Sequence, residues 1–352
     1  MSPGTEVVHV VCTEAFAGVE RYVATLARVQ DAQGSRVRVL GGDGPRMRAE
    51  LAGSGVHWSP AGTPWQAAHA LTRLRDVRVV HAHMTAAETA AVLAARAPVV
   101  ATRHFASTRG SSTPARAVGR LVSARIAGQV AISAYVAARV EGASTVIHPG
   151  VPDQAVTSSG RRPVVLVAQR LEAEKRTDLA LRIWAASGLA GRGWRLQVAG
   201  SGARLAELRD LAEALDVSAS CDFLGARTDV GRLMAHAAIF LAPRPDEPYG
   251  LSVVEAMAHA TPVVASDGGG HVETVGLCPD AVLVRAEAVA EAGGQLAALA
   301  ADATRRAGYG AALRELQRRL FTVEAHASRL EEVYRGVVAR GRGAAPVPDG
   351  AR

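Results

Sequence analysis

The chain has 352 residues, which exceeds one ordinary domain and suits two, each able to close its own core. The sequence is 49% hydrophobic. Its three cysteines lie far apart, which excludes a disulfide framework and fits a reducing cytoplasm. A formal net charge of +7 suits an anionic partner, and the first apolar run, 7–12, is too short for a signal peptide or a membrane span.

The first half alternates between predicted strands and predicted helices. Short apolar runs predict the strands, and apolar residues three and four positions apart predict the helices. The expected strands are 7–12, 37–40, 77–81, 99–102, 130–132 and 145–147, and the expected helices are 19–28, 85–95 and 114–127. Strands joined by helical crossovers pair in parallel, so an α/β domain with a parallel sheet is expected over 1–155.

A segment rich in Pro, Gly, Ser and Thr, 149–162, interrupts this pattern and predicts a linker. After it the alternation restarts and predicts a second α/β domain over 156–325. Its expected strands are 163–168, 196–199, 239–242, 262–265 and 281–284. The apolar spacing near the end predicts a helix whose residues 326–340 return toward the first domain, followed by a disordered tail, 341–352.

Two glutamates follow the predicted strand 239–242. Glu247 lies in the loop directly after it, and Glu255 lies eight residues later, inside a predicted helix. Open α/β sheets bind ligands at this end of their strands, where carboxylates can accept hydrogen bonds from sugar and ribose hydroxyls. Two solvated charges at a chance spacing are the alternative, against which the apolar neighbours of Glu255 argue, since a buried unpaired carboxylate is costly.

The start of that predicted helix has the features of a phosphate site. Tyr249 and Gly250 let the backbone approach a ligand closely, and the amides of Gly250, Leu251 and Ser252 lie in the first turn. Free amides at a helix N-terminus bind anions. The segment therefore predicts a site for the diphosphate of a nucleotide.

Two cations follow the first predicted strand of the second half. Arg170 and Lys175 occupy the loop and helix start after 163–168. Guanidinium and ammonium groups suit a diphosphate leaving group. An exposed, ion-paired helix start is the alternative, because two glutamates and Arg176 are adjacent.

Taken jointly and in order, these motifs resemble the retaining glycosyltransferases usually called family 4. The Glu-x7-Glu signature of that family resembles Glu247 to Glu255, with Pro-aromatic-Gly between them, and its basic pair resembles Arg170 and Lys175. Further matches are the segments 17–21, 101–104, 198–202 and 269–273. The resemblance covers about residues 5–340. It departs from the family at Arg176 and Ala17, where glycine is common.

The resemblance implies the GT-B fold, in which two Rossmann-like domains with parallel sheets face each other across a cleft. It implies catalytic roles for His104, Arg170, Lys175 and Glu247. It implies donor contacts from Gly18, Arg170, Lys175, Tyr249, Gly250, Leu251, Ser252 and Glu255. On the acceptor side, Glu20, Arg103 and Arg109 are expected, and the loop 223–227 is the candidate cradle for the base.

The implied activity is transfer of a hexosyl-type sugar, with retention, from a nucleotide-diphosphate sugar to a hydroxyl of a small-molecule, lipid-linked or glycan acceptor. UDP is the favoured nucleotide, and no cofactor is expected besides this donor. The sequence has no Asp-x-Asp, and His81 and His83 have no apparent third ligand at a suitable spacing, so metal independence is expected.

A long acid-free stretch bears on partners and location. Residues 89–140 contain seven arginines and no Asp or Glu. A solvated basic face of an arginine-rich protein explains this best, and peripheral contact with an anionic membrane is the alternative. A cytoplasmic protein is expected, with the inner membrane face as the place of such contact.

Two other functions remain open. A nucleotide-sugar 2-epimerase on the same fold would convert its donor without an acceptor. A non-catalytic basic protein that binds nucleic acid would show salt-sensitive binding, yet aromatic residues for base stacking are scarce, at 4%.

Overall fold

The computed structural model describes residues 6–110, 112–156 and 160–341. The chain divides into two compact units, Met1–Pro149 with Val323–Arg352, and Gly150–Thr322. The first division thus falls at 149/150, where the sequence placed it at 155, and the chain returns to the first unit at Val323. Apart from Gly341, the expected tail lies outside the described residues.

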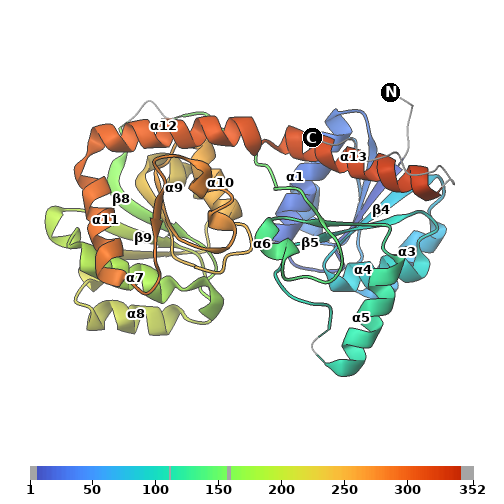
Figure 1. The fold of residues 1–352 in the computed structure, drawn as a ribbon, viewed down its shortest axis with the longest axis horizontal. Coiled ribbons are helices and arrows are strands. Elements are labelled where there is room, and N and C mark those ends of the chain that lie inside the picture. Colours follow the sequence, from blue (N-terminus) through green and yellow to red (C-terminus); the bar gives the residue numbers. More distant parts are fainter. Residues whose placement is uncertain (1–5, 111, 157–159, 342–352) are drawn as a thin grey trace. The chain divides into compact units, whose positions relative to one another are not determined.

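Within the described residues of the first unit, seven strands form one sheet in the order β3-β2-β1-β4-β5-β6-β7, and each pairs in parallel with its neighbours (Figure 1). The strands are β1 Glu6–Val10, β2 Arg36–Leu40, β3 His57–Ser59, β4 Val77–His83, β5 Val99–Arg103, β6 Gly128–Ala131 and β7 Thr145–Val146. The helices are α1 Gly18–Ala32, α2 Gly44–Glu50, α3 Pro64–Arg73, α4 Thr85–Ala94, α5 Thr113–Arg125, α6 Ala134–Ala137 and α13 Val323–Gly341.

The core of this unit occupies both faces of the sheet. Val7 and Val8 are neighbours in β1 but belong to different apolar clusters, because successive side chains of a strand point to opposite faces. Val7 packs in the cluster that contains Leu26 of α1 and Leu330 of α13, and Val8 in the one that contains Leu71 of α3. The last helix, drawn in red in Figure 1, is therefore part of the first unit's core.

In the described part of the second unit, six strands form a parallel sheet in the order β10-β9-β8-β11-β12-β13 (Figure 1). The strands are β8 Arg162–Ala168, β9 Arg195–Ala199, β10 Cys221–Gly225, β11 Ala237–Ala242, β12 Val263–Ser266 and β13 Val282–Val284. The α-helices are α7 Thr177–Ser187, α8 Leu205–Ala214, α9 Val230–His236, α10 Leu251–Ala258, α11 Val289–Ala301 and α12 Ala303–Leu320. The short 3-10 helices are η1 Ala173–Lys175, η2 Ala190–Arg192, η3 Ser218–Ser220, η4 Gly269–His271 and η5 Val275–Leu277.

The two strands that the sequence did not predict are edge strands. β3 and β10 end their sheets, and most of their residues are only partly buried. An edge strand lacks the continuous apolar run that marks a buried parallel strand. The expected loop 223–227 is corrected accordingly, because Phe223 lies within β10.

Two further properties bear on the sequence-based expectations. Cys12, Cys221 and Cys278 are free thiols. None of the helices in the described part of the chain combines the length and the apolar content that crossing a bilayer requires.

Candidate functional site

The loop between β11 and α10 carries Glu247, and glycines of the following loop hold its backbone. A Cβ atom at Gly269 would lie 2.3 Å from the carbonyl oxygen of Glu247, and one at Gly270 would lie 2.4 Å from Cα of Tyr249. Gly269 also has φ +56°, and the amide of Gly270 donates to the Glu247 carbonyl at 2.7 Å. Only glycine permits this approach, so the match at 269–273 is a backbone support for the Glu247 loop.

The side chain of Gln169 holds the turn that carries Lys175. The side-chain amide of Gln169 donates to the carbonyl of Lys175 at 2.8 Å and to the hydroxyl of Thr177 at 2.9 Å. A Cβ at Gly200 would lie 1.8 Å from the carbonyl oxygen of Gln169. The glycine after β9 therefore lets two post-strand loops touch, and this contact fixes the start of η1 and α7.

Lys175 and Glu247 meet at the ends of their two loops. The ammonium Nζ donates to Oε2 at 2.8 Å and to Oε1 at 3.0 Å. The lysine side chain is 18% exposed and the glutamate side chain 16%. The structure thus brings together one of the expected cations and one of the expected acids, in a position that solvent still reaches.

Arg170 has a different neighbour. Its side chain is 60% exposed and pairs with Glu174, four residues further along, at 2.8 Å. Arg244, which the sequence reasoning missed, lies 3.8 Å from Glu247 and 3.0 Å from Asp246. The signal for it was its place three residues before Glu247, in the same post-strand loop.

Electrostatics link these charges into one group. The pKa of the Glu174 carboxyl lies below its ordinary value, chiefly through a backbone hydrogen bond and then through the charges of Arg170 and Arg244, while desolvation acts the other way. Burial acts to raise the pKa of the Asp246 carboxyl, but the hydrogen bond and charge of Arg244, a backbone hydrogen bond and the charge of Lys175 together lower it below its ordinary value. Three cations therefore surround these acids at the strand ends.

The helix start expected to bind phosphate is present. Gly250 caps α10 with φ +88° and ψ 54°, and its carbonyl accepts from the amide of Val253 at 2.9 Å. Leu251 and Ser252 occupy the first turn and are partly buried, whereas Tyr249 is buried. Amides of a first helical turn have no partner within the helix and point outward along its axis. Glu255 follows one turn later on α10 and is partly buried.

Three residues expected on the acceptor side have internal partners instead. The carboxylate of Glu20 accepts from the backbone amide of Ala17 at 2.8 Å and from the hydroxyl of Thr13 at 2.7 Å, which anchors the start of α1 at Gly18. Arg109 forms an ion pair with Glu88 in which both side chains are 0% exposed. Both charged groups are thus enclosed by partners within the first unit, and the expected acceptor-side contacts of Glu20 and Arg109 stay a prediction.

Arg103 is enclosed in the same way. Its guanidinium donates to the carbonyl of Ser107 at 2.6 Å and to Glu141 at 3.3 Å, and it lies 3.8 Å from Glu88. Arg103, Arg109, Glu88 and Glu141 form a four-charge cluster around the loop after β5. This cluster is neutral in sum, and in it both arginines hold the loop after β5. Their expected place on the acceptor side stays a prediction.

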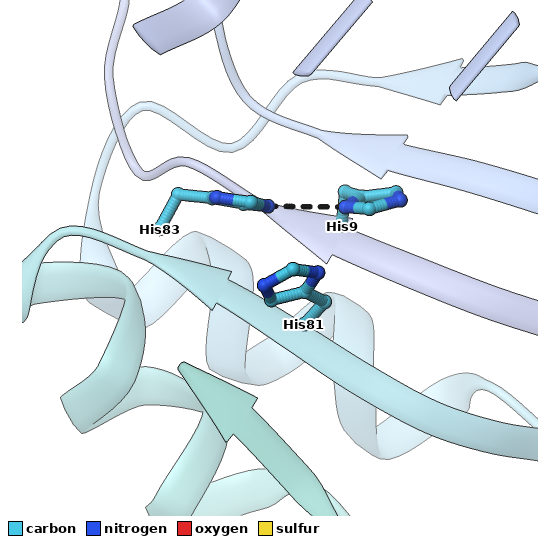
Figure 2. A group of neighbouring side chains, drawn as sticks. All are labelled: His9, His81 and His83. Carbon is cyan, nitrogen blue, oxygen red and sulfur yellow. Dashed lines mark hydrogen bonds between the residues drawn. The ribbon is translucent and has the colours of Figure 1, made fainter. Parts of the chain in front are cut away.

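His104 directly follows β5 and joins a cluster of buried histidines. The parallel register places His9 of β1 opposite His81 of β4. Among the described residues, His9, His81 and His83 are the one group of three possible metal ligands, and Figure 2 shows their rings side by side. His9 is thus the third histidine that the sequence reasoning missed, because it comes from a distant strand. Burial lowers the pKa of His104 to about 3 and that of His9 to about 4.

Comparisons with known proteins place these features in a family. The model of the family described as "Glycosyl transferases group 1" matches residues 153–315, and that of "Glycosyltransferase Family 4" matches residues 16–155. An uncharacterized glycosyltransferase of Haemophilus influenzae is 33% identical over 101 residues, which are 29% of each chain. A protein of Mycobacterium tuberculosis named GDP-mannose-dependent alpha-(1-6)-phosphatidylinositol dimannoside mannosyltransferase is 36% identical over 127 residues, 35% of this chain and 32% of that one.

These two alignments span a third or less of the relatives' length. Among solved structures, HepE of Anabaena in complex with UDP is similar over 94% of this chain and 100% of its own, with a TM-score of 0.78 and 17% identity. That likeness shows the fold, and the two family matches together cover residues 16–315. The chain belongs to the family-4 glycosyltransferases, with two Rossmann-like units of the GT-B class.

Proposed function

We propose that the chain transfers a hexosyl-type sugar, with retention, from a nucleotide-diphosphate sugar to a hydroxyl of an acceptor. The observation that carries this proposal is the paired contact of Lys175 with both oxygens of Glu247, beside the start of α10. A partly exposed ammonium next to free helical amides is suited to a diphosphate, and a carboxylate beside it is suited to the hydroxyls of the attached sugar.

In this mechanism the protein orients the donor and stabilises the leaving group. The acceptor hydroxyl attacks on the face from which the diphosphate departs, the bond from the anomeric carbon to the phosphate oxygen breaks, and the leaving phosphate takes the acceptor proton. Lys175, Arg170 and Arg244 offset the charge that grows on the diphosphate. Because Glu247 already holds the ammonium, little reorganisation is needed when the donor binds.

The remaining donor contacts follow from the helix start. The amides of Gly250, Leu251 and Ser252 bind phosphate oxygens, Tyr249 shapes the backbone before them, and Glu255 accepts from the ribose hydroxyls. UDP is the favoured nucleotide, in line with the UDP bound by the Anabaena structure, and GDP is the competing choice, since the mycobacterial relative is named for GDP-mannose. Three cations at the site make a metal ion unnecessary for leaving-group charge.

The first experiment measures which nucleotide stabilises the protein and whether the cations act in turnover. A thermal-shift screen of UDP, GDP, ADP and dTDP identifies the donor, because ligands that prefer the native state raise the melting temperature. With that donor, Lys175→Ala is expected to lower turnover by about 10²–10³-fold, the size seen when one stabilising donor is removed. The rate should persist in the presence of a chelator.

A matched control is available for the exposed cation. Arg285→Ala removes an arginine of the same unit that is 68% exposed and paired with Glu291, much as Arg170 is paired with Glu174. Arg170→Ala should lower turnover, and Arg285→Ala should not. Wild-type rates in both Lys175→Ala and Arg170→Ala would contradict the leaving-group role, and conversion of the donor without any acceptor would favour the epimerase.

For the acceptor, we extend the proposal to a lipid-linked hydroxyl at an anionic membrane. Helix α5 exposes Val118 at 53% and Leu121 at 70%, and Arg116 and Arg120 lie on the same helix. Exposed apolar and basic side chains on one helix suit an interface with anionic lipid. Vesicles with phosphatidylglycerol should sediment more protein than neutral vesicles, and Leu121→Ser should reduce the difference. Equal partitioning would leave α5 a solvated basic face.

His104 is the residue of the first unit that we propose to contact the substrate. It directly follows β5 and is buried, with 8% of its surface exposed, and it stays neutral because burial lowers its pKa to about 3. A neutral imidazole can accept a hydrogen bond from a sugar hydroxyl. His104→Ala should therefore lower kcat/KM, and unchanged kinetics would remove His104 from the site.

A further inference from the structure

The histidine cluster of the first unit is a hydrogen-bonded network. The candidate ligand atoms of His9, His81 and His83 lie within 4.8 Å of one another, which is a spacing that could suit a metal ion. Each of their ring nitrogens nevertheless already has a partner. The bonds are His9 Nε2 with Gln30 Oε1 at 2.7 Å, His9 Nδ1 with His83 Nε2 at 3.0 Å, His83 Nδ1 with His104 Nε2 at 3.1 Å, His81 Nδ1 with Tyr334 OH at 2.6 Å and His81 Nε2 with Thr102 Oγ1 at 2.6 Å.

A metal ion would have to break one of these bonds at every ring. Figure 2 shows the edge-to-edge contact of His9 and His83 as a dashed line, with the ring of His81 beside them. The centroids of the His81 and His83 rings are 4.2 Å apart, at an angle of 37°. The network is therefore the better account of the cluster.

Three of these bonds form a chain with a fixed direction. It runs from Gln30 through His9 and His83 to His104. The amide oxygen of Gln30 only accepts, so Nε2 of His9 must carry the proton. In a neutral imidazole the other nitrogen is then an acceptor, so Nε2 of His83 donates to it. By the same step, Nε2 of His104 donates to Nδ1 of His83.

The direction holds because the rings are neutral. Burial lowers the pKa of His9 to about 4 and that of His104 to about 3, and it lowers that of His83 well below its ordinary value. A protonated imidazole would place two donors against each other at one of the contacts. Near neutral pH each ring therefore has one donor and one acceptor nitrogen. The position of the proton on His9 then determines its position on His104.

The far end of the hydrogen-bond chain is His104, which keeps 8% of its surface exposed. Among the described residues, Nδ1 of His104 has no hydrogen-bond partner. The fully enclosed polar atoms without a partner are Glu88 Oε1, His259 Nδ1 and Gln317 Oε1, and Nδ1 of His104 is not among them. We propose that Gln30 is a positioning residue that fixes the Nε2–H tautomer of His104 through His9 and His83, so that Nδ1 of His104 accepts a hydrogen bond from a substrate hydroxyl. The contact with a substrate rests on the proposed function, whereas the tautomer does not.

The Gln30 amide has a partner at each of its two atoms. Its nitrogen donates to the hydroxyl of Tyr334 at 3.4 Å, while its oxygen faces His9 at 2.7 Å. Tyr334 is buried in α13 and also contacts His81. The final helix thus helps to orient the amide. A reversed amide would invert every donor in the chain and give His104 the opposite tautomer, which makes the proposal testable at one atom.

The tautomer can be read directly by NMR. Long-range proton–nitrogen correlation spectra of protein labelled at histidine distinguish a protonated from a bare ring nitrogen, and His104→Gln identifies the His104 signals. In the wild-type protein, Nε2 of His104 should carry the proton and Nδ1 should be bare. In Gln30→Met the fixed end is lost, and His104 should become a mixture of both tautomers.

Two further variants distinguish the loss of the acceptor opposite His9 from the loss of a buried glutamine as such. Gln30→Glu keeps an acceptor opposite His9 and should retain the wild-type tautomer of His104 where the spectra show a single proton on His9, even if Gln30→Met folds poorly. A doubly protonated His9 would instead reverse the donors along the network. Gln317→Met removes a buried glutamine of the second unit and should leave the His104 signals unchanged. A proton on Nδ1 of His104 in the wild-type protein, an unchanged single tautomer in folded Gln30→Met, or stoichiometric zinc binding that shifts the signals of His9, His81 and His83 would each overturn the proposal.

Kinetics then test the consequence for a substrate. Gln30→Met should lower kcat/KM by the same factor across the pH range in which His104 stays neutral. If the spectra show the expected tautomer in a protein without transferase activity, the proposed function fails while the tautomer assignment stands. If transfer occurs and His104 carries the opposite tautomer, the assignment fails alone.

Discussion

Polar side chains gather beyond the carboxyl ends of parallel strands in both units, but the two groups differ in their access to solvent. Lys175 and Glu247 of the second unit keep 18% and 16% of their side chains exposed. Arg109 and Glu88 of the first unit are fully enclosed. Enclosing a charge carries a desolvation cost that only fixed partners offset, so the enclosed pair suits a structural role and the accessible pair suits a ligand.

The histidines of the first unit extend this contrast, because they are polar groups that burial keeps neutral. Each can therefore donate at one nitrogen and accept at the other. A charged group attracts a ligand over a distance, whereas a neutral network orients one acceptor atom. Four predictions test how far this difference between the units holds, starting with the largest effect.

Acid should destabilise the first unit through its buried histidines. The pKa values of His9 and His326 are lowered from 6.5 to about 4, chiefly by burial. Between these values the unfolded chain binds protons that the folded chain does not, so stability is complete above pH 6.5 and falls as the pH drops toward 4. Each histidine contributes about 3 kcal/mol to this loss. Hydrogen exchange, corrected for its intrinsic pH dependence, should show β1 and β4 losing protection in this window.

A pair of variants tests the cause of that acid sensitivity. His326→Gln can still accept from Tyr22, whose hydroxyl lies 2.7 Å from the histidine ring, and it cannot be protonated. Its stability should fall less steeply between pH 6.5 and 4 than that of the wild-type protein. His57→Gln, at an exposed position, should behave as the wild-type protein does. An identical pH dependence in all three proteins would show that these buried rings do not control acid unfolding.

Removing one partner of the enclosed pair should be costly for folding. Arg109→Met leaves the carboxylate of Glu88 buried without its main partner and should lower the free energy of unfolding by about 3–5 kcal/mol. Lys175→Ala should change it by less than about 1 kcal/mol, because Glu247 keeps contact with water. Urea unfolding measures both. Equal losses in the two variants would break the contrast between the units.

The glycine beneath Glu247 should be needed for its position. Gly269→Ala places a Cβ 2.3 Å from the Glu247 carbonyl oxygen at φ +56°, whereas Gly188→Ala has φ +63° and nothing within 4 Å. Both variants carry the left-handed strain of about 1–2 kcal/mol, and only Gly269→Ala displaces the loop. Its loss of stability and of donor affinity should exceed that of Gly188→Ala. Matching losses would mean that the loop tolerates the contact.

The smallest effect is expected at Arg176. This residue adopts φ +52° and ψ 41° between η1 and α7, at the position where the resembled family commonly has glycine. Arg176→Gly removes left-handed strain, but it raises the conformational entropy of the unfolded chain and loses the ion pair with Asp178. The free energy of unfolding is therefore expected to rise by about 1 kcal/mol or less. Thermal unfolding measures it, and a clear destabilisation would show that the pair with Asp178 matters more than the strain.

Local sequence determined the main elements and identified the two residues of the Lys175–Glu247 pair. Apolar runs located the buried strands because a strand covered on both faces needs apolar side chains throughout. Lys175 and Glu247 were both identified by their positions after predicted strands, and they meet because the ends of parallel strands share one edge of the sheet. The half-exposed edge strands β3 and β10 escaped notice because their side chains carry no such pattern.

Only the tertiary structure decided which polar groups face solvent and which face each other. Charged side chains are typical of binding sites, which is why the sequence favoured Glu20, Arg103 and Arg109. Their enclosure arises from partners elsewhere in the fold. His9 reaches His83 through the pairing of β1 with β4, and Gln30 on α1 determines which nitrogens donate along the hydrogen-bond chain. Burial and hydrogen-bond direction depend on atoms brought together from distant segments, so no local pattern in the chain encodes them.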